Sequence, residues 1–284
     1  MTIKVWSGLM ENIIIVRGAG DLSTATIHKL HKCGFNVVAL EIEKPLAIRR
    51  KVAFSEAVYL GEIEVEGVVC RLCNNIEEIK KALRDNKVAL VVDESGKYIE
   101  KLKPRVVVDA ILAKKNLGTN KNMADLTIAL GPGFCAGEDV DIVIETMRGH
   151  NLGRIITNGY ALKNTGVPGT IQGIGKDRVV YSSCRGTVKI IAKIGDIVKK
   201  GQVLGYIVDQ ENKVEIKASI DGLLRGIIRD GSNVSSNLKI LDIDPRIDQL
   251  ENCHTISDKA RCIAGSVLEV ILSHKEGSKC MKKY

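Results

Sequence analysis

Residues 131–141 read GPGFCAGEDVD, a stretch that combines a proline between two glycines, a cysteine and three acids. Gly131 and Gly133 flank a rigid turn whose backbone N–H groups suit an anionic ligand. Cys135 is the one side chain of the stretch that can act as a nucleophile once it is a thiolate. The pattern therefore predicts a ligand-facing loop with Cys135 as the candidate catalytic residue, or a turn in which this cysteine only fills space.

Metal binding is a weaker interpretation of the same region, and no metal site is predicted. Asp141 and Glu145 share one face of a strand, but four residues along a strand separate them by about 13 Å.

Cys70 and Cys73 (CRLC) have the spacing of zinc or redox ligands. A single such pair is more typical of small buried side chains than of a metal site.

A second candidate site lies near the N-terminus. Residues 12–16 (NIIIV) predict a buried strand, and an amphipathic helix follows the segment RGAGDLSTA. Gly18 and Gly20 have the spacing of a dinucleotide-binding turn, in which the first glycine allows a tight turn. The second lets the backbone approach a pyrophosphate at the helix N-terminus.

Polar residues around this turn complete the predicted binding site. Asp21 and Ser23 belong to the turn, with Ser23 in place of the third glycine of the fingerprint. Glu41 ends the next predicted strand, 21 residues after Gly20 (41 − 20), where an acid accepts the ribose hydroxyls. Arg49 and Arg50 follow, either to bind a further phosphate or to begin a solvated helix.

Strands and helices continue to alternate through the first half of the chain, which favours a parallel sheet covered on both faces. Ligands in such sheets bind at the carboxyl ends of the strands. Asp109 ends the predicted strand 105–109, and Gly131 follows the predicted strand 125–130. Both are therefore expected on the same rim as the glycine turn.

Composition bounds these expectations. The chain has 284 residues, a net charge of +8 and eight cysteines. It contains no apolar run long enough for a membrane span and no recognisable signal peptide, so a cytoplasmic protein with reduced cysteines is expected. Its basic residues are scattered and not interleaved with aromatic ones, so neither nucleic acid nor a membrane is an expected partner.

The second half contains an internal repeat. The segment starting at Gly186 matches the segment starting at Gly222 at an offset of 36 (222 − 186), including Gly195 with Gly231. Short strands and glycine turns in two copies predict an all-β barrel. A helix over 256–271 follows and is expected to pack back on one of the domains.

This half resembles the biotinyl/lipoyl carrier domain, a barrel-sandwich hybrid, in the segment VEIKASIDG at 214–222. The resemblance implies that a modified lysine would lie between methionines on the preceding hairpin. Residues 209–213 (DQENK) contain no methionine. No covalent biotin or lipoate is therefore expected on Lys213 or Lys217, and a docking role is preferred.

The whole chain resembles the selenium-dependent molybdenum hydroxylase accessory proteins, a maturation family related in theme to xanthine dehydrogenase accessory factors. The matching stretches include VRGAGDLSTA (16–25), GPGFCAGEDVDIVIETMRGHNLGR (131–154), LDIDPR (241–246) and ISDKARCIAGSVLE (256–269). The resemblance implies handling of the molybdenum cofactor and delivery to a molybdenum hydroxylase apoenzyme. Cys135 would then carry sulfur or selenium.

The predicted fold class is α/β. A Rossmann-like, doubly wound, mostly parallel sheet over 1–178 is followed by a small barrel-sandwich hybrid over 179–248, and by a C-terminal helix and tail over 249–284. The leading functional hypothesis is the accessory role. An NAD(P)-dependent oxidoreductase and a non-catalytic nucleotide-binding scaffold are the alternatives, so whether the chain is an enzyme stays open. A homo-oligomer also stays open.

Overall fold

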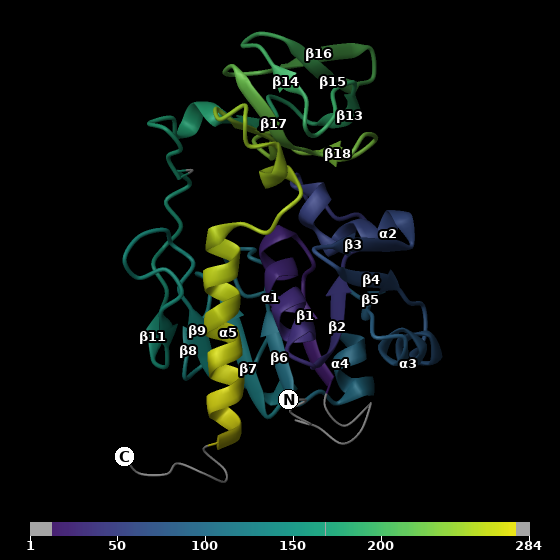
Figure 1. Ribbon diagram of the computed structural model, residues 1–284, viewed down its shortest axis with the longest axis vertical. Helices are drawn as coiled ribbons and strands as arrows, with labels where there is room; N and C mark the ends of the chain where they lie inside the picture. The colour runs from purple at the N-terminus through teal and green to yellow at the C-terminus, as the bar shows by residue number, and fades with distance from the viewer. Residues whose placement is uncertain (1–12, 168, 277–284) are drawn as a thin grey trace. The chain divides into compact units, whose positions relative to one another are not determined.

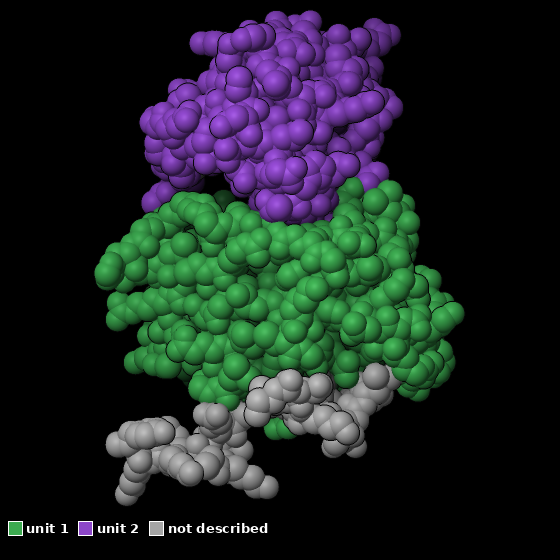
Figure 2. Space-filling view, in the orientation of Figure 1, with its two compact units in different colours: residues 1–43, 54–164, 256–284 green, residues 44–53, 165–255 purple. Residues whose placement is uncertain are grey.

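A computed structural model describes residues 13–167 and 169–276 of the chain (Figure 1). Within this range the chain divides into two compact units (Figure 2). Unit 1 takes the described residues up to 43, residues 54–164 and those from 256 onward, and unit 2 takes residues 44–53 and 165–255. Each unit therefore combines segments that are distant in the sequence.

Unit 1 is built on a sheet of nine strands in the order β10-β9-β7-β6-β1-β2-β5-β4-β3. The strands from β9 to β4 pair in parallel, whereas β3 and β10 pair antiparallel at the two edges. Their bounds are β1 Ile13–Arg17, β2 Asn36–Glu41, β3 Glu62–Val65, β4 Val68–Leu72, β5 Val88–Val92, β6 Val106–Asp109, β7 Leu126–Leu130, β9 Ile142–Ile144 and β10 Ile155–Ile156. Asn12, the first residue of the predicted first strand, lies outside the described residues.

The central strands form where β-branched residues run without interruption. All five residues of β1 (IIIVR) and of β7 (LTIAL) are buried. Parallel strands covered on both faces are continuously apolar for this reason. One face packs on α3 (Ile76–Arg84) and α4 (Lys97–Leu102) through a core that includes Ile15 and Ile79.

The other face of the sheet is covered by α1 (Asp21–Lys32) and α5 (Asp258–Glu276), which lie side by side in Figure 1. α5 comes from the end of the chain and packs over β7 and β9. The helix predicted over 256–271 does pack back, as expected. Ile263 and Val267 of this helix are both 0% exposed, so the helix buries this part of the sheet.

The predicted doubly wound fold is wrong, because the sheet is mixed and its helices do not alternate with all its strands. The connection from β6 to β7 contains only the 3-10 turn η3 (Lys121–Met123). The connection from β7 to β9 contains β8 (Cys135–Ala136), which pairs with β11 (Gly159–Tyr160) as a separate two-stranded sheet. A doubly wound sheet needs a crossover helix at both places; here α5 covers the face instead.

Unit 2 consists of two four-stranded antiparallel sheets, β16-β15-β13-β18 and β12-β19-β17-β14. The strands are β12 Val179–Tyr181, β13 Gly186–Ile190, β14 Ile197–Val198, β15 Val203–Asp209, β16 Asn212–Lys217, β17 Gly222–Ile227, β18 Asn233–Val234 and β19 Lys239–Asp244. Among the described residues no ladder joins the two sheets. The predicted barrel-sandwich hybrid is therefore corrected to two facing sheets around one apolar core.

The internal repeat of the sequence recurs in this unit. A Cβ at Gly186 would lie 2.6 Å from the carbonyl oxygen of Val208, and a Cβ at Gly222 would lie 2.5 Å from that of Asp244. Both partners are also 36 residues apart (244 − 208). The repeated glycines are thus explained by the same close approach of two strands in each copy.

Among the helices of the described residues, none is both long and apolar enough to cross a membrane.

The packing of α5 on the sheet can be tested by shortening one of its buried side chains. Ile263→Ala should lower the free energy of unfolding by about 2–5 kcal/mol, because it opens a cavity against α1 and the sheet. Leu272→Ala, at a side chain that is 43% exposed, should change it by less than about 0.5 kcal/mol. Urea denaturation of both variants measures the difference, and equal effects would contradict the packing role of α5.

Candidate functional site

The parallel strands of unit 1 bring several predicted site residues to one edge. β1, β2, β6 and β7 run in the same direction, so their carboxyl ends share one edge of the sheet. Gly18 follows β1, Glu41 and Asp109 end β2 and β6, and Gly131 follows β7. This edge is the candidate functional site.

Gly18 has a backbone conformation and a packing that only glycine allows. Its φ is +94°, and a Cβ would lie 2.9 Å from the carbonyl oxygen of Ala110. Its amide donates to the carbonyl oxygen of Leu40 (2.7 Å). Ser23 Oγ donates to the same Ala110 carbonyl (3.1 Å). Gly18 and Ser23 thus join the glycine turn to the segment after β6, and neither presents a side chain to a ligand.

Gly20 is the N-cap residue of α1 and leaves the helix end open. It provides no side-chain cap, and the nearest atom to a Cβ built there is Ser23 Oγ at 4.0 Å. Asp21 uses Oδ1 to accept the amide of Leu22 (2.9 Å). The positive end of a helix dipole and an accessible backbone are what an anion needs at such a turn.

Glu41 faces the glycine turn. Its Oε2 accepts the amide of Ala19 and its Oε1 accepts the amide of Ile42, each at 2.8 Å. Burial raises the pKa of this carboxyl, and the two amides only partly oppose that effect. Glu41 therefore holds the turn in place and keeps acceptor capacity beside it.

Asp109 is closed off from solvent. It is 2% exposed, its Oδ2 accepts the hydroxyl of Thr119 (2.5 Å), and Arg17 Nη1 lies 3.7 Å from the same oxygen. Arg17 also donates to the Thr119 hydroxyl. Burial raises the pKa of Asp109 despite these partners. The network fixes the start and the end of loop 110–119, which touches the glycine turn at Ala110.

The loop after β7 is shaped by close contacts of its two glycines. A Cβ at Gly131 would lie 2.6 Å from Thr146 Oγ1, and a Cβ at Gly133 would lie 2.7 Å from the backbone of Lys115. Gly133 thus packs on loop 110–119, just as Gly18 does. Glycine contacts therefore join loop 110–119 both to the glycine turn after β1 and to the loop after β7.

Cys135 lies in β8 and is 5% exposed. Its amide donates to Asp139 Oδ2 (2.7 Å). Its thiol contacts the hydroxyl of Tyr160, the residue opposite it on the paired strand β11. This hydrogen bond raises the pKa of Tyr160. The thiol is therefore engaged by the Tyr160 hydroxyl and does not project freely from the loop.

Arg49 and Arg50 belong to unit 2, where backbone carbonyls engage them. Arg49 Nη2 donates to the carbonyl oxygens of Asn252 (3.0 Å) and Thr255 (2.9 Å). Arg50 Nε donates to that of Ile227 (2.9 Å). Both arginines therefore hold backbone segments of unit 2 together.

Lys259 is a residue that the sequence analysis missed. It lies in the first turn of α5, half-buried, with Asp21, Glu145 and Asp258 as neighbouring acids and Arg148 as a neighbouring cation. Burial lowers its pKa, and Arg148 adds to that effect. A lysine in the first turn of an amphipathic helix is typical of a solvated surface, so only the docking of α5 on α1 reveals it.

No group of three or more His, Cys, Asp or Glu side chains within the described ranges is arranged to hold a metal ion. Cys70 and Cys73 are both buried, and burial raises the pKa of the Cys70 thiol well above its usual value and that of Cys73 to about 11. Buried, protonated thiols are poor ligands and poor nucleophiles.

No family model matches the chain. The uncharacterized protein YqeB of Escherichia coli (strain K12) is 46% identical over 262 residues, which are 92% of this chain and 48% of that protein. The chain thus spans about half the length of this relative. Similar solved structures include the ectoine utilization protein EutE (DoeB) from Ruegeria pomeroyi, with 11% identity and a TM-score of 0.26 over 82% of this chain and 84% of that one. An aspartoacylase family protein from Mesorhizobium loti has 11% identity and a TM-score of 0.27 over the same shares.

These comparisons correct the family prediction. Five of the similar structures are named as aspartoacylase, succinylglutamate desuccinylase or ectoine utilization proteins. The predicted accessory family is therefore wrong, and so is the maturation role that it implied for Cys135 and for a hydroxylase partner. TM-scores of 0.25–0.27 give this chain neither the fold nor the activity of those structures.

Substitutions at Gly18 and Gly20 distinguish a glycine that packing requires from a glycine that leaves room for a ligand. Gly18→Ala should lower the free energy of unfolding by about 1–3 kcal/mol, since the new Cβ meets the Ala110 carbonyl in a left-handed conformation. Gly20→Ala should be neutral within about 0.5 kcal/mol, because its Cβ enters open space. Chemical denaturation checks both, and a large loss at Gly20 would contradict the open helix end.

The lowered pKa of Lys259 predicts a pH-dependent stability. The folded protein binds the lysine proton less tightly than the unfolded chain, so stability from this residue is present above pH 10.5 and lost as pH falls through the folded pKa. Lys259→Met should therefore gain stability at pH 7, by less than about 1 kcal/mol. The gain should shrink toward pH 10, as measured by denaturation across pH. A gain that grows with pH would contradict the lowered pKa.

Proposed function

We propose that unit 1 binds a small molecule through a phosphate or pyrophosphate group at the Gly18–Gly20 turn. The observation that carries the proposal is the uncapped N-terminus of α1, a helix of 12 residues, with open space in front of Gly20. This end lies at the carboxyl edge of a parallel sheet, where ligands of such sheets bind. The backbone N–H groups and the helix dipole supply the attraction for the anion.

The neighbouring residues support a dinucleotide of the NAD type as the ligand class. Glu41 lies against the turn and can accept hydroxyl groups of a ribose. A carboxylate there disfavours a 2′-phosphate, so NAD is preferred to NADP. Gly131 and Gly133 support the rim of the site, and Asp109 acts indirectly by holding loop 110–119. The proposal concerns binding and includes no reaction.

Three expectations from the sequence stand beside this proposal as predictions: a cytoplasmic location, the absence of covalent biotin or lipoate, and a homo-oligomer.

The test is calorimetric titration of the full chain with NAD and with inorganic pyrophosphate. Gly20→Val should abolish binding of both, because the added side chain occupies the space that the phosphate needs, while circular dichroism shows a folded protein. Gly265→Val is the matched control, since that glycine of α5 also has open space around a built Cβ. Binding that survives Gly20→Val, or no binding by the unaltered chain, refutes the proposal.

A further inference from the structure

The internal repeat of unit 2 relates two sheet faces that differ in what covers them. β15 and β19 are the equivalent strands of the two copies, and Tyr206 corresponds to Asp242 (242 − 206 = 36). Tyr206 pairs with Lys189 and Glu215 on its neighbouring strands, and Asp242 pairs with Gly226. In both sheets these paired residues point away from the apolar core, to which Val188, Ile207 and Ile216 belong in the first sheet.

In the second sheet, another segment of the chain covers this outer face. A Cβ at Gly226 would lie 3.0 Å from the carbonyl oxygen of Ile48 and 3.3 Å from Arg49 Cγ. The Ile48 carbonyl accepts the amide of Ile227 (2.9 Å), and Arg50 returns a bond to the Ile227 carbonyl. On the same sheet Asp242 is 3% exposed, and Arg178 Nη1 bonds its Oδ1 at 2.5 Å. Residues 48–50, which lead into the 3-10 turn η1 (Arg50–Val52), thus lie against β17 on this face.

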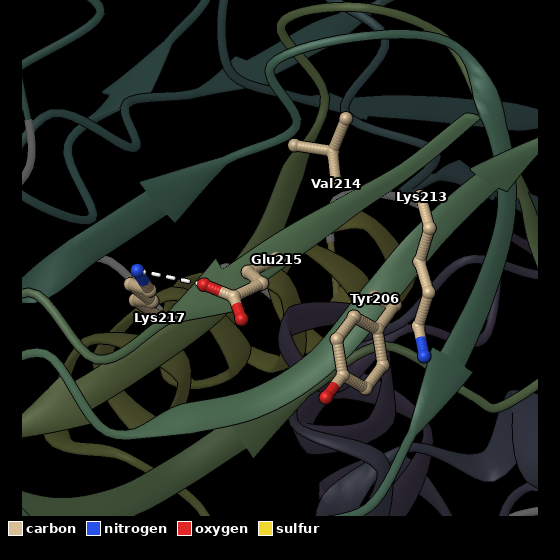
Figure 3. A pocket seen from close by; sticks show the side chains of 5 residues that line it. All are labelled: Tyr206, Lys213, Val214, Glu215 and Lys217. Carbon is tan, nitrogen blue, oxygen red and sulfur yellow. Dashed lines mark ion pairs between the residues drawn. The ribbon is translucent and has the colours of Figure 1, made fainter.

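In the first sheet, the equivalent face is open (Figure 3). Lys213 places its Nζ 3.7 Å from the ring centre of Tyr206, and Lys217 pairs with Glu215 at 2.7 Å. The side chains of Lys213, Glu215 and Lys217 are exposed, as is Lys189 on β13. We call this set the lysine face: Lys189, Tyr206, Lys213, Glu215 and Lys217.

The charge of the lysine face indicates what can cover it. Lys189 and Lys213 lie beside a half-buried aromatic ring, Lys217 lies further along β16, and the single acid, Glu215, is already paired with Lys217. The covered face has an acid at its centre, Asp242, with Arg178, Arg225 and Lys239 as the neighbouring cations. An acidic segment is therefore the electrostatic complement of the lysine face, and Tyr206 is a suitable apolar anchor at its centre.

We propose that the lysine face is a docking surface for an extended acidic segment of a partner protein. The repeat provides the precedent within the same unit, because the equivalent face is covered by a polypeptide segment and not by a separate domain. This inference concerns unit 2 only and is independent of ligand binding at the glycine turn.

The test uses a ten-residue polyglutamate peptide added to the isotope-labelled full chain, with amide chemical shifts followed by NMR. Shifts should concentrate on β13, β15 and β16, and binding should weaken as salt rises. Lys189→Glu with Lys213→Glu should weaken binding about tenfold or more. Lys193→Glu with Lys200→Glu makes the same charge change at exposed lysines off this face and should have a much smaller effect.

Tyr206→Ala should also weaken the peptide, whereas Tyr206→Phe should retain it, which separates the apolar anchor from simple attraction of charge. Equal losses in the two lysine double variants, or shifts spread over the whole surface, would overturn the proposal. A ten-nucleotide single-stranded DNA that binds the same face more tightly than the peptide would also overturn it, in favour of a nucleic-acid surface.

Discussion

The contact between the Gly18 backbone and the Ala110 carbonyl is the constraint on which the carboxyl edge of unit 1 depends. It sets how closely the turn after β1 approaches the segment after β6, and no side chain larger than hydrogen fits between them. The Arg17–Asp109–Thr119 network lies directly behind it and is fully enclosed. A buried charge pair of this kind contributes little net stability, but removing one partner leaves the other unpaired at high cost. Its consequence here is a fixed position for loop 110–119.

The same edge shows how one helix alters the chemistry of a surface. α5 covers the part of the sheet where β6, β7 and β9 follow one another without crossover helices. Its docking on α1 brings Lys259 among Asp21, Glu145 and Arg148, and burial there lowers the lysine pKa. A lysine that would have an ordinary pKa on an isolated helix thus has a lowered pKa beside the glycine turn. Perturbed groups of this kind concentrate at functional sites, although structural clusters also produce them.

Unit 2 shows that a repeated sequence need not produce two equal surfaces. The two copies share their glycine contacts, with Gly186 and Gly222 each packed against a carbonyl of the equivalent strand. Their outer faces have diverged, since the buried Asp242 stands where the first copy has Tyr206, while Tyr206 remains partly exposed beside Lys189 and Lys213. Burial of Asp242 is tolerated because Arg178 Nη1 bonds its Oδ1 at 2.5 Å.

The sequence by itself determined the local elements: the apolar run that becomes β1, the glycine turn before α1, the helix of α5 and the repeat of unit 2. These follow from side-chain size, β-branching and glycine spacing, which act over a few residues. Tertiary structure alone decided the rest. A lysine in α5 and an aspartate in α1 are more than two hundred residues apart, and only packing brings Lys259 to Asp21. Likewise, the crossover helices that alternation predicted are absent after β6, because α5 from the distant end of the chain buries that face instead.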